Sequence, residues 1–219
     1  MAPAESLKAL RDLQGCFRLA RLELWAPHLG VGDPSQVVAI QVLAGAVIQM
    51  SLLTSLSIPG GFVTDGLLLH ISLLPLLETL VISSTPLVHS LLGGECYGFP
   101  SLRSLDVPND NFLRRFLSYP IRGLETLRVR NLDQNTIPLV ARKFPNLQRL
   151  SIGGEDFSSH KMFVLGGCFQ LEEITVCAHR PLGMDDLDMH RFRAMFRNLR
   201  SLLIDCPTGA RGGGEACAR

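Results

Sequence analysis

Apolar residues recur along this chain in one six-residue frame. Its first position is leucine, and its fourth and sixth positions are aliphatic, as in Leu102–Val107. We call this pattern the repeat frame. Its eight copies begin at Leu19, Leu53, Leu77, Leu102, Leu124, Leu147, Leu171 and Leu199, at intervals of 34, 24, 25, 22, 23, 24 and 28 residues. A period near 24 residues, sustained over the chain, predicts a repeat architecture.

Each copy of the repeat frame predicts a short strand. The fourth and sixth positions alternate with polar neighbours at the strand period of two, so both point into a core. The first leucine fills the space where the chain enters the strand. No copy could bury its leucines alone, so we expect the copies to stack as a parallel sheet.

The segments between the copies have the apolar spacing of short helices. A helix between successive strands allows each parallel crossover to cover one side of the sheet. The expected helices are residues 6–14, 34–50, 65–74, 111–118, 136–144, 160–165 and 185–197. We therefore predict one α/β domain over residues 5–207, followed by a disordered, glycine-rich tail over residues 208–219.

Three copies are preceded by a proline motif. The pattern Phe-Pro-x-Leu-x-x-Leu begins at Phe99 and at Phe144, and Leu-Pro-x-Leu-Glu-x-Leu begins at Leu74. With the repeat frame, these motifs resemble leucine-rich repeat proteins, and in particular the F-box/leucine-rich-repeat proteins of fungi. The resemblance implies a horseshoe solenoid of about eight repeats, with a parallel sheet on the concave face and short helices on the convex face.

The same resemblance implies a non-enzymatic protein-interaction module and, more narrowly, the substrate-recognition part of an F-box-type ubiquitin ligase receptor. The chain departs from that family in two ways. No F-box precedes the repeats, so a Skp1–cullin complex is an expected partner only if an F-box lies upstream. The asparagine or cysteine that usually follows each strand is also missing. A free-standing scaffold or inhibitor protein without a ubiquitin ligase role is the alternative.

A second alternative is a membrane protein that spans near residues 37–58. No charged residue occurs from Pro34 to Thr64. This uncharged segment is long enough to span a membrane. However, the segment contains polar residues such as Gln41 and Gln49, and its second half is a copy of the repeat frame. We therefore expect a buried helix and strand there.

Composition narrows the classes of partner. The formal net charge is +1, so no strong field favours nucleic acid or a membrane surface. The six cysteines form no CxxC pair, which favours reduced thiols and a cytoplasmic or nuclear location. The acids of Asp185–Asp188 suit a helix dipole better than a metal. We expect a monomer with no cofactor, metal site or catalytic residue.

The exposed strand positions supply the candidate binding residues. They form columns on the predicted concave face, where Arg128, Arg130 and Arg149 lie close together with Asp106 and Glu173 beside them. One interpretation is the electrostatic part of a protein-binding groove. The other is a solvated face whose arginines pair with these acids.

Two features concern the ends of the predicted array. Trp25, the one tryptophan, ends the first strand and is either a binding residue or a cap on the open end. Solenoids need polar caps, and neither end of this array has one. We therefore expect a truncated or incomplete array with marginal solubility.

Overall fold

The computed structural model describes residues 12–24, 34–83, 98–133, 135–154, 163–168, 170–178 and 186–205. These residues fall into two compact units, which we describe separately. The first unit is Met1–Pro108 with Ser118–Ile121, and the second is Asn109–Leu117 with Arg122–Arg219. The predicted tail lies outside the described residues, and the predicted single domain over residues 5–207 stays a prediction.

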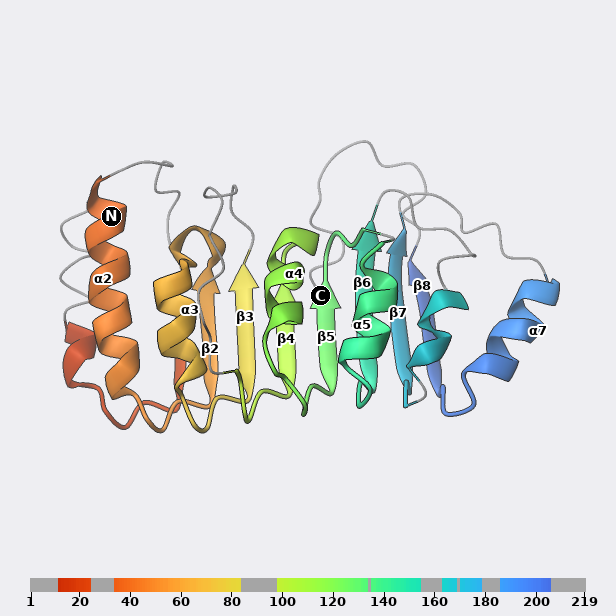
Figure 1. Cartoon of the computed structure of the whole chain (residues 1–219), viewed down its shortest axis with the longest axis horizontal. Helices are drawn as coiled ribbons and strands as arrows, with labels where there is room; N and C mark the ends of the chain where they lie inside the picture. The colour runs from red at the N-terminus through yellow and green to blue at the C-terminus, as the bar shows by residue number, and fades with distance from the viewer. Residues whose placement is uncertain are drawn as a thin grey trace. The chain divides into compact units, whose positions relative to one another are not determined.

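The first unit contains four parallel strands in chain order (Figure 1). They are β1 (Arg21–Glu23), β2 (Ser55–Pro59), β3 (Thr79–Ser83) and β4 (Ser104–Val107). Their register aligns the repeat frames, because the fourth positions Leu22, Leu56, Leu80 and Leu105 are paired from strand to strand. The four leucines therefore form one column in the core.

The second unit repeats this arrangement with four more parallel strands in chain order. They are β5 (Thr126–Val129), β6 (Arg149–Gly154), β7 (Glu173–Ala178) and β8 (Ser201–Asp205). The sixth frame positions Val129, Ile152, Val176 and Ile204 are again paired in register. Each of the eight copies of the repeat frame thus forms a strand, which confirms the predicted leucine-rich repeat fold.

A repeated hydrogen-bond pattern holds this register. The backbone carbonyl at the second frame position accepts two bonds from the next copy. In the second unit, Glu125 O accepts from Gln148 N at 2.8 Å and from Arg149 N at 2.9 Å. In the first unit, Thr54 O accepts in the same way from the backbone N–H groups of residues 78 and 79. Within each unit, every copy is thereby fixed to the copy before it at the start of its strand.

Helices cover one face of the strands within each unit, as Figure 1 shows. They are η1 (Leu13–Gly15), α2 (Pro34–Gln49), η2 (Gly60–Phe62), α3 (Asp65–Ser72), α4 (Asp110–Ser118), α5 (Ile137–Lys143), η3 (Leu165–Gly167) and α7 (Asp186–Met195). Five of the expected helices agree with α2, α3, α4, α5 and α7 to within a few residues. The helices expected over 6–14 and 160–165 lie largely outside the described residues.

The apolar segment near residues 37–58 is divided between two elements. α2 ends at Gln49, and residues 55–59 form β2 in the sheet. Among the described residues, no helix has the length and apolar character needed to cross a membrane. The predicted helix and strand are therefore what this segment forms.

The core of the second unit consists of the frame positions of β5, β6 and β7. Leu127, Leu150 and Ile174 are at most 2% exposed. In β8 the same positions are less covered: Leu202 is half-buried, and the side chain of Ile204 is 36% exposed. The last described strand therefore leaves part of its apolar side uncovered.

Candidate protein-binding face

The side of β5–β8 opposite the helices is a continuous polar surface, which we call the open face. It consists of alternate strand residues, whose side chains point away from the core. Its members are Thr126, Arg128, Arg149, Ser151, Gly153, Glu173, Thr175, Cys177, Ser201, Leu203 and Asp205. Three of the predicted site residues, Arg128, Arg149 and Glu173, lie on it.

Arg149 and Glu173 stand opposite each other on β6 and β7. The Arg149 Nε lies 3.5 Å from the Glu173 Oε2, and the two side chains are 58% and 53% exposed. The two residues thus form the ion pair that the second interpretation expects, and whether Arg149 also binds a partner stays a prediction. An exposed pair of this kind contributes less than about 1 kcal/mol to folding, so a partner carboxylate could replace Glu173 at little cost.

The other two arginines lie on or just beyond β5. Arg128 is half-buried and is aligned with Ser151 of β6. Arg130 follows the end of β5 and is exposed. Its backbone carbonyl lies against Gly153 of β6, where a Cβ would come within 2.3 Å of the Arg130 oxygen. Gly153 thus permits the turn after β5 to lie against β6, a contact that sequence reasoning missed.

Asp106 and Trp25 belong to parts of the chain other than β5–β8. Asp106 lies on β4 of the first unit, where it is half-buried and aligned with Val81. Its predicted association with the arginines stays a prediction. Trp25 lies outside the described residues, and its role also stays a prediction.

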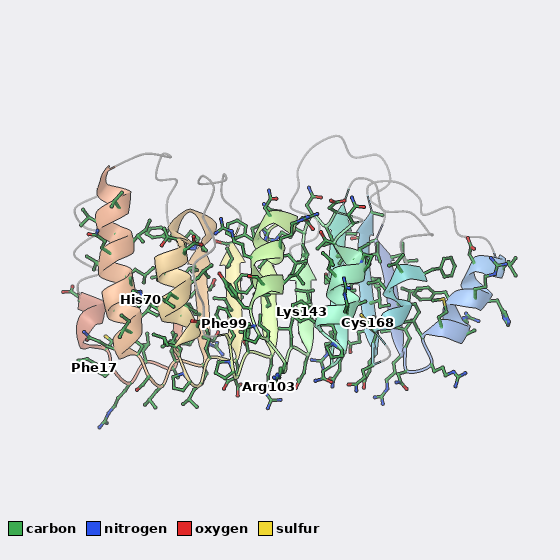
Figure 2. The ribbon with its side chains drawn as sticks, in the orientation of Figure 1. Phe17, His70, Phe99, Arg103, Lys143 and Cys168 are labelled. Atoms are coloured by element: carbon green, nitrogen blue, oxygen red, sulfur yellow. The ribbon has the colours of Figure 1, made fainter. Side chains whose placement is uncertain are left out.

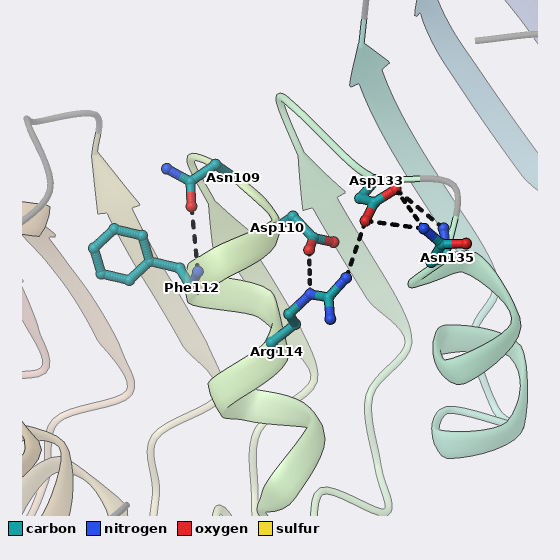
Figure 3. Close-up of polar contacts among 6 residues, drawn as sticks. All are labelled: Asn109, Asp110, Phe112, Arg114, Asp133 and Asn135. Atoms are coloured by element: carbon teal, nitrogen blue, oxygen red, sulfur yellow. Dashed lines mark hydrogen bonds and ion pairs between the residues drawn. The ribbon is translucent and has the colours of Figure 1, made fainter. Parts of the chain in front are cut away.

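A polar network ties the first turn of α4 to the segment after β5 (Figure 3). Asn109 Oδ1 accepts a hydrogen bond from Phe112 N at 3.2 Å, which caps the start of α4. Arg114 donates from Nε to Asp110 and from Nη2 to Asp133 Oδ2, the latter at 3.0 Å. Because each of these groups has a partner within the network, we interpret it as structural.

The network also explains two pKa shifts. The backbone N–H of Asn135 donates to Asp133 and, with its side-chain amide and Arg114, holds the pKa of Asp133 below its usual value. The hydrogen bond and charge of Asp110 raise the pKa of Arg114, and Asp133 adds to this. The lowered Asp133 pKa favours the folded state above the unfolded carboxyl's pKa, and this contribution is lost as pH falls through the folded value.

Backbone bonds replace the side-chain ladder that the sequence lacks after its strands. In the second unit, Asp110 N donates to Asn131 O at 2.8 Å, and Leu132 N donates to Gly153 O at 3.0 Å. These bonds join successive turns at the ends of the strands. A regular asparagine or cysteine is therefore not required at these positions.

The cysteines differ in state. Cys168, labelled in Figure 2, is buried and free. Its burial raises the pKa of the thiol to about 11. Cys16 is free and half-buried. Cys177 of β7 is disulfide-bonded, and its partner lies outside the described residues. The prediction of reduced thiols is therefore wrong for Cys177.

We expect these states to be visible in alkylation at pH 8. Cys16 should react with iodoacetamide, whereas Cys168 should not, because its pKa of about 11 and its burial both remove accessible thiolate. Cys177 should react only after reduction. Peptide mass spectrometry with and without reductant measures all three. Fast labelling of Cys168 in the folded chain would contradict its placement in the core.

Comparisons with known proteins give one structural likeness and no assignment of function. No protein-family model matches the chain, and no curated protein matches it. Among solved structures, internalin C2 from Listeria monocytogenes is similar at 16% sequence identity with a TM-score of 0.44. That similarity covers 92% of this chain and 85% of that chain.

The aligned frames, parallel register and one-sided helices define a leucine-rich repeat fold in each unit. Among the described residues, no group of histidine, cysteine, aspartate and glutamate is arranged to hold a metal ion. The residues of the open face offer charge at Arg149 and Glu173, hydrogen bonding at Ser151 and Thr175, and apolar contact at Leu203.

Proposed function

We propose that this chain is a protein-interaction module that binds a protein partner on the open face of β5–β8. The supporting observation is the row of Arg128, Ser151, Thr175 and Leu203, which lies in register across four strands. One side of the row carries a cation and the other carries a leucine that is 56% exposed. A surface of rigid strands with both kinds of contact suits recognition of a folded partner.

Small residues occupy the centre of the open face. Ser151, Gly153 and Thr175 have short side chains or none. Arg128 and Arg149 stand on one side of them. A partner that places an acidic group beside these arginines and an apolar group against Leu203 would fill the face. The charges favour selection and fast association of an acidic partner.

Charge reversal tests this proposal. We expect the double variant Arg128→Glu and Arg149→Glu to lose protein partners that the unaltered chain retains in affinity purification with mass spectrometry. Like charges facing an acidic partner should lower its affinity at least about tenfold. The variant should fold normally, since neither side chain is in the core.

The matched control is Arg122→Glu with Arg142→Glu. It makes the same change in net charge at two exposed positions, one before β5 and one in α5, away from the open face. The control should keep the partners. If both double variants keep the same partners as the unaltered chain, binding at the open face is excluded.

A narrower role as the substrate-recognition part of an F-box-type ubiquitin ligase receptor rests on the proline motifs before the strands. In that role the chain, in its full-length context, should co-purify with a Skp1–cullin complex, and the arginine variants should lose substrates while keeping that complex. Partners without Skp1 and cullin would favour the alternative of a scaffold or inhibitor. The proposed module acts as a monomer, which sedimentation equilibrium can check.

A further inference from the structure

The outer edge of β8 combines three features that no other strand of the second unit shows together. The first is uncovered apolar surface. Ile204 is 36% exposed, whereas Val176, aligned with it in β7, is fully buried. Leu202 is half-buried, whereas its partner Ile174 is 1% exposed. These side chains occupy core positions of the repeat frame, and among the described residues no further strand covers them.

The second feature is a row of backbone groups directed away from β7. Ser201 N donates to Glu172 O at 3.0 Å, so the backbone of Ser201 faces the preceding copy. Successive residues of a parallel strand direct their N–H and C=O groups to alternate sides. Leu202 and Ile204 therefore direct theirs to the outer edge, where no strand of the described chain pairs with β8. Such an edge can accept an additional strand.

The third feature is positive charge beside the start of β8. An open cavity of about 460 Å³ lies between the end of α7 and β8. Phe192 and Phe196 line it with tightly packed rings, 4.4 Å apart between centroids. Arg193 and Arg197 also line it. They are exposed and, within the part of the chain that the structure describes, neither forms an ion pair.

Arg200 completes this group of cations. It lines the same cavity and is paired with Glu172, Nη1 to Oε2, at 3.7 Å. Its side chain is 79% exposed. Three arginines thus surround an aromatic-walled cavity next to an uncovered strand edge. Figure 1 shows α7 and β8 as the last helix and strand of the second unit.

We propose that the β8 edge is a second docking site, which takes an extended acidic segment of another protein by strand addition. The segment pairs with the backbone of Leu202 and Ile204, and its apolar residues cover their side chains. Its acidic residues lie beside the start of β8, where they contact Arg193, Arg197 and Arg200. This site is separate from the open face and does not depend on the function proposed for that face.

Charge distinguishes this occupant from a second copy of the chain. Two β8 edges joined by a twofold axis would pair antiparallel and would bring two sets of the same three arginines onto one interface. Like charges in an interface oppose association, whereas an acidic segment neutralises them. The charge of the edge therefore favours a different, acidic chain.

The test uses a fluorescein-labelled synthetic peptide, a run of aspartates followed by alternating leucine and threonine. A second peptide carries lysines in place of the aspartates. We expect the acidic peptide to bind the full chain in fluorescence anisotropy, and the lysine peptide to bind at least about tenfold more weakly. The variant Arg193→Glu with Arg197→Glu should lower the affinity for the acidic peptide by a similar factor. Raised salt should lower this affinity too.

Hydrogen exchange supplies a readout at the backbone. Saturating acidic peptide should slow exchange of the Leu202 and Ile204 amides at least about tenfold. The variant Arg128→Glu with Arg149→Glu should still bind the peptide, because those residues lie on the open face. Circular dichroism confirms that each variant is folded.

Three outcomes would overturn the proposal. The first is equal binding of both peptides, or binding of neither. The second is slow exchange of the Leu202 and Ile204 amides in the free, monomeric chain, since the chain would then cover its own edge. The third is a dimer in sedimentation whose formation protects these amides, which would make a second copy the occupant.

Discussion

Replacing Gly153 by alanine is expected to destabilise the second unit by roughly 2–3 kcal/mol, the upper part of the range for overpacking a closely packed site. The added Cβ would lie 2.3 Å from the backbone oxygen of Arg130. That oxygen cannot retreat freely. The next residue, Asn131, accepts from Asp110 N at 2.8 Å, and Leu132 donates to the Gly153 carbonyl at 3.0 Å.

The relief of this clash must therefore break backbone hydrogen bonds or bend β6. The measurement is a denaturant unfolding curve followed by circular dichroism, in which the midpoint should fall with little change in slope. A displaced Arg130 should also alter partner retention at the open face. This variant therefore links the stability of the turn after β5 to the proposed function.

The neighbouring glycine provides the control. A Cβ at Gly154 would lie 3.6 Å from Leu132 O, an ordinary contact distance. Neither glycine has a positive φ, so the two substitutions differ in space and not in backbone strain. Gly154→Ala should stay within about 1 kcal/mol of the unaltered chain. Equal losses for both variants would show that the close approach of Arg130 is not what requires Gly153.

The strands were predictable because one periodic signal specifies them. Leucine at the first frame position and aliphatic residues at the fourth and sixth satisfy the local strand period and the stacking of copies at once. The two requirements agree at all eight copies, which is why the register followed from aligning the frames. Local capping was less visible: α4 begins at Asp110, one residue before the expected start, because Asn109 caps it.

The candidate site was predictable to the extent that it follows the columns. Arg149 and Glu173 occupy the same frame position in adjacent copies, so their pairing follows from the alignment. The approach of Arg130 to Gly153 does not follow from it. It is a contact between a turn and the neighbouring strand. The sequence feature that indicates it is a glycine at a strand position.

The arginines of the β8 edge were missed for a different reason. Arg193 lies in the last turn of α7 and Arg197 follows the helix, whereas the predicted binding residues come from strand columns. The sequence nevertheless indicates a cluster of cations, since Arg200 follows Arg197 by three residues, just before the last copy's strand. The exposure of Leu202 and Ile204 in β8 is a finding of the structure, and the expected marginal solubility stays a prediction.

The second large effect is expected in the core. Ile152→Ala should cost about 2–5 kcal/mol, the usual range for removing a buried isoleucine side chain. Ile152 is the sixth frame position of β6 and is 1% exposed. It lies between Val129 and Val176 in the core column, so both neighbouring copies lose contacts. Denaturant unfolding of the full chain measures the loss.

Ile204→Ala is the matched variant, with the same residue, the same change and the same frame position in β8. Its side chain is 36% exposed and has a paired neighbour only on β7 within the described chain. We expect a loss on the order of 1 kcal/mol, because hydrophobic stabilisation scales with the area removed from water. A cost for Ile204→Ala equal to that of Ile152→Ala would mean that the β8 edge is already covered in the free chain.

The same pair of variants also separates folding from docking. Ile152→Ala should lower stability without changing the intrinsic affinity for the acidic peptide, as long as the chain remains folded. Ile204→Ala should cost little stability and should weaken binding of the acidic peptide, because its side chain forms part of the surface that an added strand would bury. Measuring both quantities for both variants shows whether apolar surface at the end of a repeat array serves folding or binding.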